Sequence, residues 1–172
     1  MVLTPASDSD LEVLHAQLGR EPRGVIAIAA RCVCGNPAVV RTAPRLPDGT
    51  PFPTQYYLTH PGAVAAVSSV EAVGTMREMQ DRLGEDEELA AAYRAAHEVY
   101  LEQRYELGDV PEIHAISAGG MPDRVKCLHV LAGQSLAQGR GVNPLGDEVL
   151  DRLGAWWSSG PCVPTGPTDG QA

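Results

Sequence analysis

Hydrophobic residues alternate with small or polar residues between Gly24 and Cys32, and this alternation predicts a β-strand. Residues 34–37, Cys-Gly-Asn-Pro, have the composition of a turn, so residues 38–42 are expected to return as an antiparallel partner. A third strand is expected at residues 56–60. Together these segments predict a small antiparallel sheet of about three strands. The residues expected on one face of the first strand are Ile26, Ile28, Ala30 and Cys32.

Helical periodicity dominates the remainder of the chain. Residues 61–83 carry an apolar residue at about every third position, and the acidic run 85–88 is typical of the N-terminus of a following helix. Because only a short turn separates these two helices, they are expected to form an antiparallel αα-hairpin. Helices are expected at residues 8–18, 61–83, 85–107, 122–138 and 143–157.

The length of 172 residues is that of one domain. The elements above predict a single α+β domain over residues 1–157, in which the small sheet is packed by the αα-hairpin and further helices. Residues 158–172 are rich in proline, glycine and threonine, and are expected to form a disordered tail.

The chain has a net charge of −9, and its acidic residues concentrate between positions 61 and 112. Proteins that bind DNA or RNA usually present a basic stripe, so this charge argues against nucleic acid as a partner. No apolar run approaches the roughly 18–20 residues that span a bilayer. The first residues also lack the basic and apolar regions of a signal peptide. We therefore expect a cytoplasmic protein without membrane insertion.

The densest group of reactive side chains lies in Ser117–His129. Two adjacent glycines let the backbone approach a ligand closely, and Pro122 is suited to open a helix whose free N–H groups attract anions. We therefore expect a small anionic ligand, such as a phosphate compound, at this segment. The alternative is that Gly119 and Gly120 form a tight turn, Arg124 pairs with an acidic residue of the αα-hairpin, and Lys126 is solvated. The expected ligand-binding residues are Gly119, Gly120, Arg124 and Lys126, with Arg41 and Arg45 from the proline-rich loop 41–54.

Four cysteines in a chain expected to be cytoplasmic are candidates for free thiols, metal ligands or redox centres. The spacing argues against a metal site, because Cys-x-Cys is tighter than the usual structural zinc motif. Residues two apart on a helix, such as Cys127 and His129, also point about 200° apart. No cofactor is therefore assigned. The candidate zinc or iron ligands are Cys32, Cys34 and Cys127, with His60, His114 or Cys162 available to complete a set.

Cys127 is also a candidate nucleophile. It lies close to an expected helix start and beside Arg124 and Lys126, and all three features favour the thiolate. His129, His114 or His60 would then act as the base. The competing interpretation is that Cys127 is a small buried hydrophobic residue, as free cysteines usually are. Whether the protein is an enzyme stays open at this point.

Four segments carry a resemblance to a known family. They are RGVIAIAARCVCGNPAVV, TAPRLPDGTPFPTQYYLTHP, MREMQDRLGEDEELAAAYRAAHEVYL and SAGGMPDRVKCLHVLAGQSLAQGRGVNPLGDEVL. Over roughly residues 10–157 the chain resembles the DUF501 family of uncharacterised bacterial proteins, which are common in actinobacteria. The resemblance implies no reaction and no catalytic residue. Genes for enolase, a septum-formation-initiator-like protein and an exopolyphosphatase often lie near those of such proteins, which implies a link to cell division or to phosphate.

A noncatalytic role is the alternative to ligand binding. The acidic αα-hairpin and the Trp156–Trp157 end would then bind a protein partner in cell division, since two adjacent tryptophans cannot both face the core. The leading interpretation is an anionic ligand at residues 117–129. The first alternative is this interaction protein. The second is a protein with a Cys/His metal site or a thiol enzyme.

Overall fold

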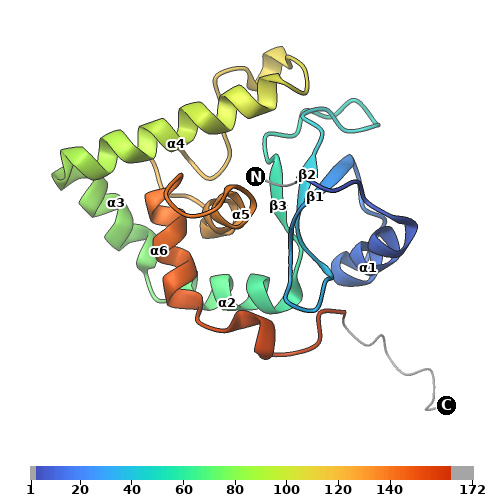
Figure 1. Ribbon diagram of the computed structural model, residues 1–172. Coiled ribbons are helices and arrows are strands. Elements are labelled where there is room, and N and C mark those ends of the chain that lie inside the picture. Colours follow the sequence, from blue (N-terminus) through green and yellow to red (C-terminus); the bar gives the residue numbers. More distant parts are fainter. Residues whose placement is uncertain (1–2, 164–172) are drawn as a thin grey trace.

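The computed structural model describes residues 3–163, which form six α-helices and a three-stranded antiparallel sheet (Figure 1). The predicted α+β class is confirmed. Helices α2, α5 and α6 lie on one side of the sheet and α1 lies on the other (Figure 1). The part of the predicted tail from residue 164 onward lies outside the described residues.

The sheet consists of the predicted hairpin and one further strand. β1 (Val25–Arg31) pairs with β2 (Pro37–Thr42), and β2 pairs with β3 (Tyr56–Leu58). The backbone N–H of Cys32 donates to the carbonyl of Asn36 at 2.8 Å and closes the turn between the first two strands. All three predicted strands are therefore present, in the order β1-β2-β3.

The predicted faces of β1 are wrong, because this strand is irregular. Its pairing with β2 shifts register between Val25 and Ala27 and again between Ile28 and Ala30. Such β-bulges break the simple alternation of side chains along a strand. As a result, Cys32 packs in the main core and Ile28 belongs to a separate cluster.

The two faces of the sheet are covered to different extents. On the main-core face, Val39, Tyr56 and Leu58 pack among residues of the long helices. On the other face, Ile28 and Val40 form a small cluster with Leu14 of α1 (Asp8–Leu18). α1 is held there by Asp10, whose carboxylate accepts hydrogen bonds from Arg31 at 2.6 and 3.0 Å.

The single helix predicted over residues 61–83 is in fact two helices. α2 (Pro61–Ala72) and α3 (Thr75–Glu85) are separated at Gly74, whose φ of +89° lies in the left-handed region. Glycine adopts this conformation without a steric penalty, and it interrupts a helix. The apolar repeat continues from α2 into α3 without a break. For this reason the sequence pattern predicts one helix, although the two helices have different axes.

α4 (Glu87–Tyr105) begins at the capping side chain of Asp86, as the acidic run predicts. Tyr93, Ala96 and Tyr100, spaced by three and four positions along this helix, are buried. The buried guanidinium of Arg104 donates to the carbonyls of Ile113 at 2.6 Å, His114 at 3.0 Å and Ile116. These bonds fix the connector after α4, which includes the short 3₁₀ helix η1 (Pro111–Ile113).

α5 (Leu128–Gln138) is the central helix, and eight of its eleven residues are buried. It packs against β3 and against α6 (Pro144–Leu153). Its polar side chains are paired inside the protein. Gln134 Nε2 donates to the carbonyl of Ala96 at 3.0 Å, and Asn143 Nδ2 donates to Gln134 Oε1 at 2.8 Å.

The predicted start of this helix is wrong, because Pro122 lies in a closed turn. The N–H of Arg124 donates to the carbonyl of Gly120 at 2.9 Å, and that of Lys126 donates to Gly119 at 2.8 Å. α5 therefore begins six residues later than Pro122, at Leu128. The last predicted helix also ends early, at Leu153, and is followed by the 3₁₀ helix η2 (Trp156–Ser158), in which Trp156 is buried and Trp157 is exposed.

The contact of α5 with β3 depends on the absence of a side chain at Gly133. A Cβ at this position would lie 2.8 Å from the carbonyl oxygen of Tyr56. We predict that Gly133→Ala lowers the free energy of unfolding by about 1–3 kcal/mol, measured by urea denaturation. Gly84→Ala in α3 is the matched control, since its Cβ would meet nothing within 4 Å. Its free energy of unfolding should stay equal or rise by about 0.5–1 kcal/mol. An equal loss in both variants would contradict close packing at Gly133.

Candidate functional site

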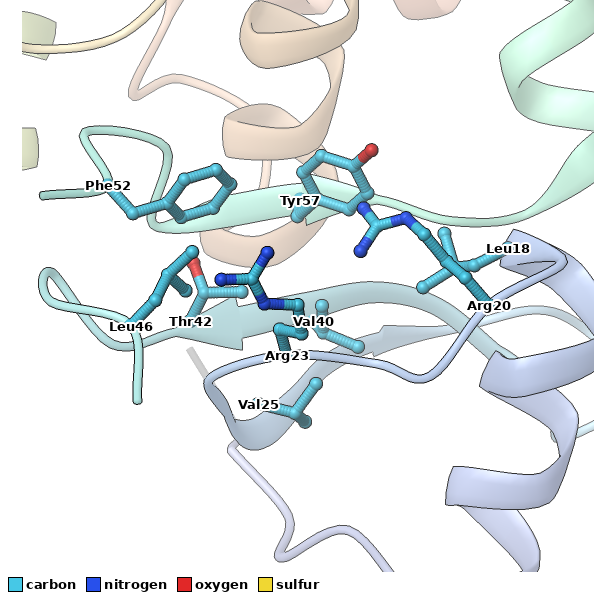
Figure 2. Close-up of a pocket in the computed structure, with 9 residues that line it drawn as sticks. All are labelled: Leu18, Arg20, Arg23, Val25, Val40, Thr42, Leu46, Phe52 and Tyr57. Carbon is cyan, nitrogen blue, oxygen red and sulfur yellow. The ribbon is translucent and has the colours of Figure 1, made fainter. Parts of the chain in front are cut away.

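A cavity of about 290 Å³ lies on the face of the sheet that carries α1 (Figure 2). Its floor consists of Val25, Val40 and Tyr57 from the three strands. The loop after β2 and the end of α1 add further apolar wall, and two arginines from the segment between α1 and β1 reach over the floor (Figure 2). The remaining lining residues are Leu18, Arg20, Arg23, Thr42, Leu46 and Phe52.

Gly24 brings the arginine segment close to the loop after β2. It has a φ of +65°, and a Cβ there would lie 2.8 Å from Cδ2 of Leu46. Its carbonyl also accepts a hydrogen bond from the N–H of Ala43 at 2.8 Å. A residue with a side chain would be strained here and would push Leu46 away, so glycine is needed to place the neighbouring arginine at the cavity.

The two arginines differ in their partners. Arg23 forms an ion pair with Asp48, whereas Arg20 makes no hydrogen bond or ion pair with another residue of the 3–163 range. The N–H and hydroxyl of Thr50 hold the pKa of Asp48 below its usual value, and the charge of Arg23 adds to this effect. Asp48 is therefore ionised at neutral pH. The cavity thus combines an apolar floor with one engaged and one unengaged guanidinium group.

A second arrangement surrounds the start of α5. Cys127 and His129 line another cavity, of about 300 Å³, together with residues of β3 and α2. Nδ1 of His129 lies 3.9 Å from Sγ of Cys127 and 3.3 Å from Oε1 of Glu71. The same carboxylate oxygen accepts the N–H of Leu128 at 2.7 Å, so Glu71 caps the helix and faces the histidine.

Electrostatics lower the pKa of Cys127 and raise the pKa of His129. Burial opposes ionisation of Cys127, yet its pKa lies below the usual thiol value because His129 and the N–H of Val130 hydrogen-bond to the sulfur. The hydrogen bond with Cys127 and the charge of Glu71 raise the pKa of His129. The other ring nitrogen, Nε2, faces the carbonyl of Val64 at 3.2 Å, which also favours a protonated ring.

The order of these groups differs from that of a Ser-His-Asp type triad. In such a triad the carboxylate and the nucleophile face opposite nitrogens of the ring. Here Glu71 and Cys127 both face Nδ1 of His129. The arrangement can hold a thiolate–imidazolium pair. It does not form a relay in which the carboxylate and the thiol bond to opposite nitrogens of the ring.

The residues predicted for the anion site lie in different surroundings. Arg124 and Lys126 are exposed on the closed turn. Arg41 is buried, and donates to the carbonyl of Gln103 at 2.6 Å and to Glu106 at 3.2 Å. Arg45 is exposed and pairs with Glu112 at 2.7 Å. Gly119 and Gly120 use their carbonyls within the turn. Anion binding by these residues stays a prediction, but without the helix N-terminus that motivated it.

The candidate metal ligands separate into two groups. Cys32 and Cys34 lie together at the turn after β1, where Cys162 and His60 join them. Cys127 belongs instead to the arrangement with His129 and Glu71. The predicted combination of Cys127 with Cys32 and Cys34 is therefore not the one that the structure brings together.

The remaining predicted residues lie on the surface. His114 is exposed, with Nδ1 2.9 Å from Asp109, and in the described part of the chain the histidine within reach of Cys127 is His129. On α4, Glu98 and Glu102 are exposed. Recognition of a protein partner through this acidic surface and Trp157 stays a prediction.

The comparisons with known proteins bear on the family. The family model described as a protein of unknown function (DUF501) matches residues 28–151, which is most of the chain. The chain belongs to the DUF501 family. Searches of curated proteins and of solved structures found no match to this DUF501 chain. Among the described residues, no helix is both long enough and apolar enough to cross a membrane.

Some residues of the candidate sites lie inside the range matched by the DUF501 family model, and others lie outside it. The match includes Cys127 and His129, and also Val40 and Tyr57 of the cavity floor, whereas the floor residue Val25 precedes it. Arg20 and Arg23 precede it, and Cys162 follows it. Sequence reasoning missed both arginines, because they lie in a short connector without hydrophobic periodicity. The available signal was two arginines next to glycines between a helix and a strand.

The pKa shifts at Cys127 can be tested by alkylation. We predict that its reaction with iodoacetamide, followed by peptide mass spectrometry over a pH series, shows a midpoint below the usual thiol pKa of about 8.5. Because the imidazole favours the thiolate, His129→Gln should move the midpoint to higher pH. The unfolded protein in urea serves as the reference with an ordinary midpoint. A folded protein with the same midpoint as this reference would contradict the thiolate–imidazolium pair.

Proposed function

We propose that this protein binds a small anionic ligand with an apolar or aromatic body in the cavity of Arg20 and Arg23. The observation that carries the proposal is the pairing of an apolar floor with two guanidinium groups that reach over it (Figure 2). Ligand sites are typically apolar concavities with a few polar groups that fix orientation. Guanidinium groups suit phosphate or carboxylate because their N–H donors match the oxygens of these anions.

The charge of the whole chain strengthens this interpretation. With a net charge of −9, the protein repels anions in general, so retention of an anion requires a local concentration of positive charge. The engaged state of Arg23 limits its contribution, because a ligand must compete with Asp48 for that guanidinium. Arg20 has no such competitor among the residues that the structure describes, and supplies the first contact.

The aromatic residues of the cavity favour a ligand with a flat body. The ring centroids of Phe52 and Tyr57 lie 6.2 Å apart with an interplanar angle of 45°, and both rings line the cavity. The volume of about 290 Å³ lies near the lower end of the range for small-molecule pockets, about 300–1,000 Å³. The proposal keeps the predicted ligand class and the predicted loop 41–54. It replaces the predicted cations with Arg20 and Arg23 as the groups that bind the anion.

A matched set of probes tests the proposal by isothermal titration calorimetry. Phenyl phosphate should bind the protein, while phenol and inorganic phosphate should each bind more weakly, because each lacks one half of the recognised chemistry. We predict that Arg20→Ala weakens phenyl phosphate binding about tenfold to a hundredfold, as expected for a lost hydrogen bond to a charged group. Asp48→Asn should tighten binding, because it releases Arg23.

Arg140→Ala provides the control for this experiment. Arg140 is an exposed arginine that pairs with Asp151 on α6, and it does not line the cavity. Its removal changes the net charge by the same amount as Arg20→Ala and should leave phenyl phosphate binding unchanged. Failure of phenyl phosphate to bind, or equal binding by the wild type and Arg20→Ala, would remove the proposed site.

A further inference from the structure

Three cysteines and a histidine from distant parts of the chain converge at the turn between β1 and β2. Sγ of Cys162 lies 2.9 Å from Sγ of Cys34, 3.5 Å from Sγ of Cys32 and 3.1 Å from Nε2 of His60. The ligand atoms of Cys32, His60 and Cys162 all lie within 4.8 Å of one another. Cys34 joins this group through its contact with Cys162.

These four residues come from three parts of the fold. Cys32 follows the last residue of β1, and Cys34 lies in the turn before β2. His60 is the residue before α2, and its Nδ1 accepts the N–H of Gly62 at 3.1 Å. Cys162 lies after η2, beyond the last helix of the described chain. The sheet, α2 and the C-terminal segment therefore meet at one point.

The approach of the C-terminal segment is specified by more than the sulfur contacts. Nε2 of Gln17 in α1 lies 3.0 Å from both the carbonyl of Cys162 and the carbonyl of Pro37. Trp156 packs its ring against His60, with the ring centroids 4.8 Å apart. Backbone and aromatic contacts thus position Cys162 at the cluster independently of its side chain.

We propose that Cys32, Cys34, His60 and Cys162 bind one zinc ion, which ties the C-terminal segment to the sheet. Three sulfurs and one imidazole nitrogen form a Cys₃His set, which is an established ligand set of structural zinc sites. Four protein ligands complete a tetrahedron and leave no open position, so the ion has a structural role. Cys32 and His60 are buried, which shields the ion from water on the protein side.

The dimensions of the cluster are close to those that zinc requires. Ligands at about 2.0–2.3 Å from a tetrahedral ion lie about 3.5–3.8 Å from one another. The three contacts made by Cys162 span 2.9–3.5 Å, so each must lengthen by less than about 1 Å. Cys34 stands outside the set of ligand atoms that lie within 4.8 Å of one another, so its sulfur must also move closer to Cys32 or His60. Cys34 is exposed and lies on a turn, where such an adjustment is least restricted.

The hydrogen bonds of His60 require a change when zinc binds. Nδ1 accepts the N–H groups of Gly62 and Ala63, so a neutral ring carries its proton on Nε2, which faces Cys162. Coordination through Nε2 moves the ring proton to Nδ1 and removes these two helix-capping bonds. A helix cap contributes far less free energy than a structural zinc site, so coordination prevails.

A disulfide between Cys34 and Cys162 explains fewer of the observations. It would use only the sulfurs of Cys34 and Cys162. The contacts of Cys32 and His60 with Sγ of Cys162 would then have no explanation. The cluster of Cys127, His129 and Glu71 is a weaker metal site, because the carboxylate oxygen of Glu71 already accepts the N–H of Leu128 at 2.7 Å.

Metal analysis of the purified full-length protein tests the proposal. Elemental mass spectrometry after expression with added zinc should give about one zinc per chain. Cys32→Ser, Cys162→Ser and His60→Ala should each weaken zinc binding by more than the roughly 100-fold that follows loss of a supporting residue outside the ligand shell. Cys127→Ser is the matched control and should keep the full zinc content, because Cys127 lies in the other cluster.

Substitution of Cys34, which is exposed, keeps the test valid if the buried variants fail to fold. Cys34→Ser should fold, lose zinc affinity and expose the segment after Gly154 to limited proteolysis, as should removal of zinc from the wild type with a chelator. Absence of zinc together with a Cys34–Cys162 disulfide in the intact mass would overturn the proposal. So would zinc content that persists in Cys34→Ser and Cys162→Ser.

Discussion

The burial of α5 is the constraint on which the rest of the fold depends. A helix enclosed on nearly every side must have apolar, small or internally hydrogen-bonded residues around its whole circumference, and its neighbours must approach closely. Gly133 permits contact with the backbone of β3, and Gly146 permits contact between α6 and the carbonyl of Leu131. The buried amides of Gln134 and Asn143 satisfy each other, so enclosure leaves these polar groups hydrogen-bonded. The positions of β3 and α6 are therefore set by their fit to this one helix.

The same constraint explains where the chemistry lies. Because α5 occupies one face of the sheet, cavities remain at its N-terminus and on the opposite face, where α1 is too short to cover the strands. The thiol of Cys127 is placed at the start of α5, where the free amides of the helix and His129 favour the thiolate. The arginine cavity lies on the far side of the sheet. The two arrangements therefore share β3 as a wall, through Tyr57, and use different faces of it.

The parts of the fold that depend on local sequence were predictable. The alternation from Gly24 to Cys32 and the following turn predict the hairpin, and the acidic run predicts the start of α4. The start of α5 was not predictable, because the carbonyl of Gly119 accepts the N–H of Lys126, which a helix beginning at Pro122 would have bonded to the carbonyl of Pro122. The face of Cys32 depends on bulges, which the alternation does not reveal. The meeting of Cys34 with Cys162 spans 128 positions and depends on how the last segment folds back, so spacing alone could not indicate it.

The last turn of α1 connects the cysteine cluster to the arginine cavity. Gln17 bonds the carbonyl of Cys162, and the next residue, Leu18, lines the cavity, with Arg20 two residues further on. β1 provides a second connection, since Val25 at its start forms part of the cavity floor and Cys32 follows its end. Along this strand Val25 and Cys32 lie roughly 20 Å apart, so the connection through the end of α1 is the shorter one. An ion that fixes Cys162 would hold Gln17 in place and thereby restrict the connector that carries both arginines. If both proposals hold, the order of the C-terminal segment would affect anion binding in the cavity through this single helix turn.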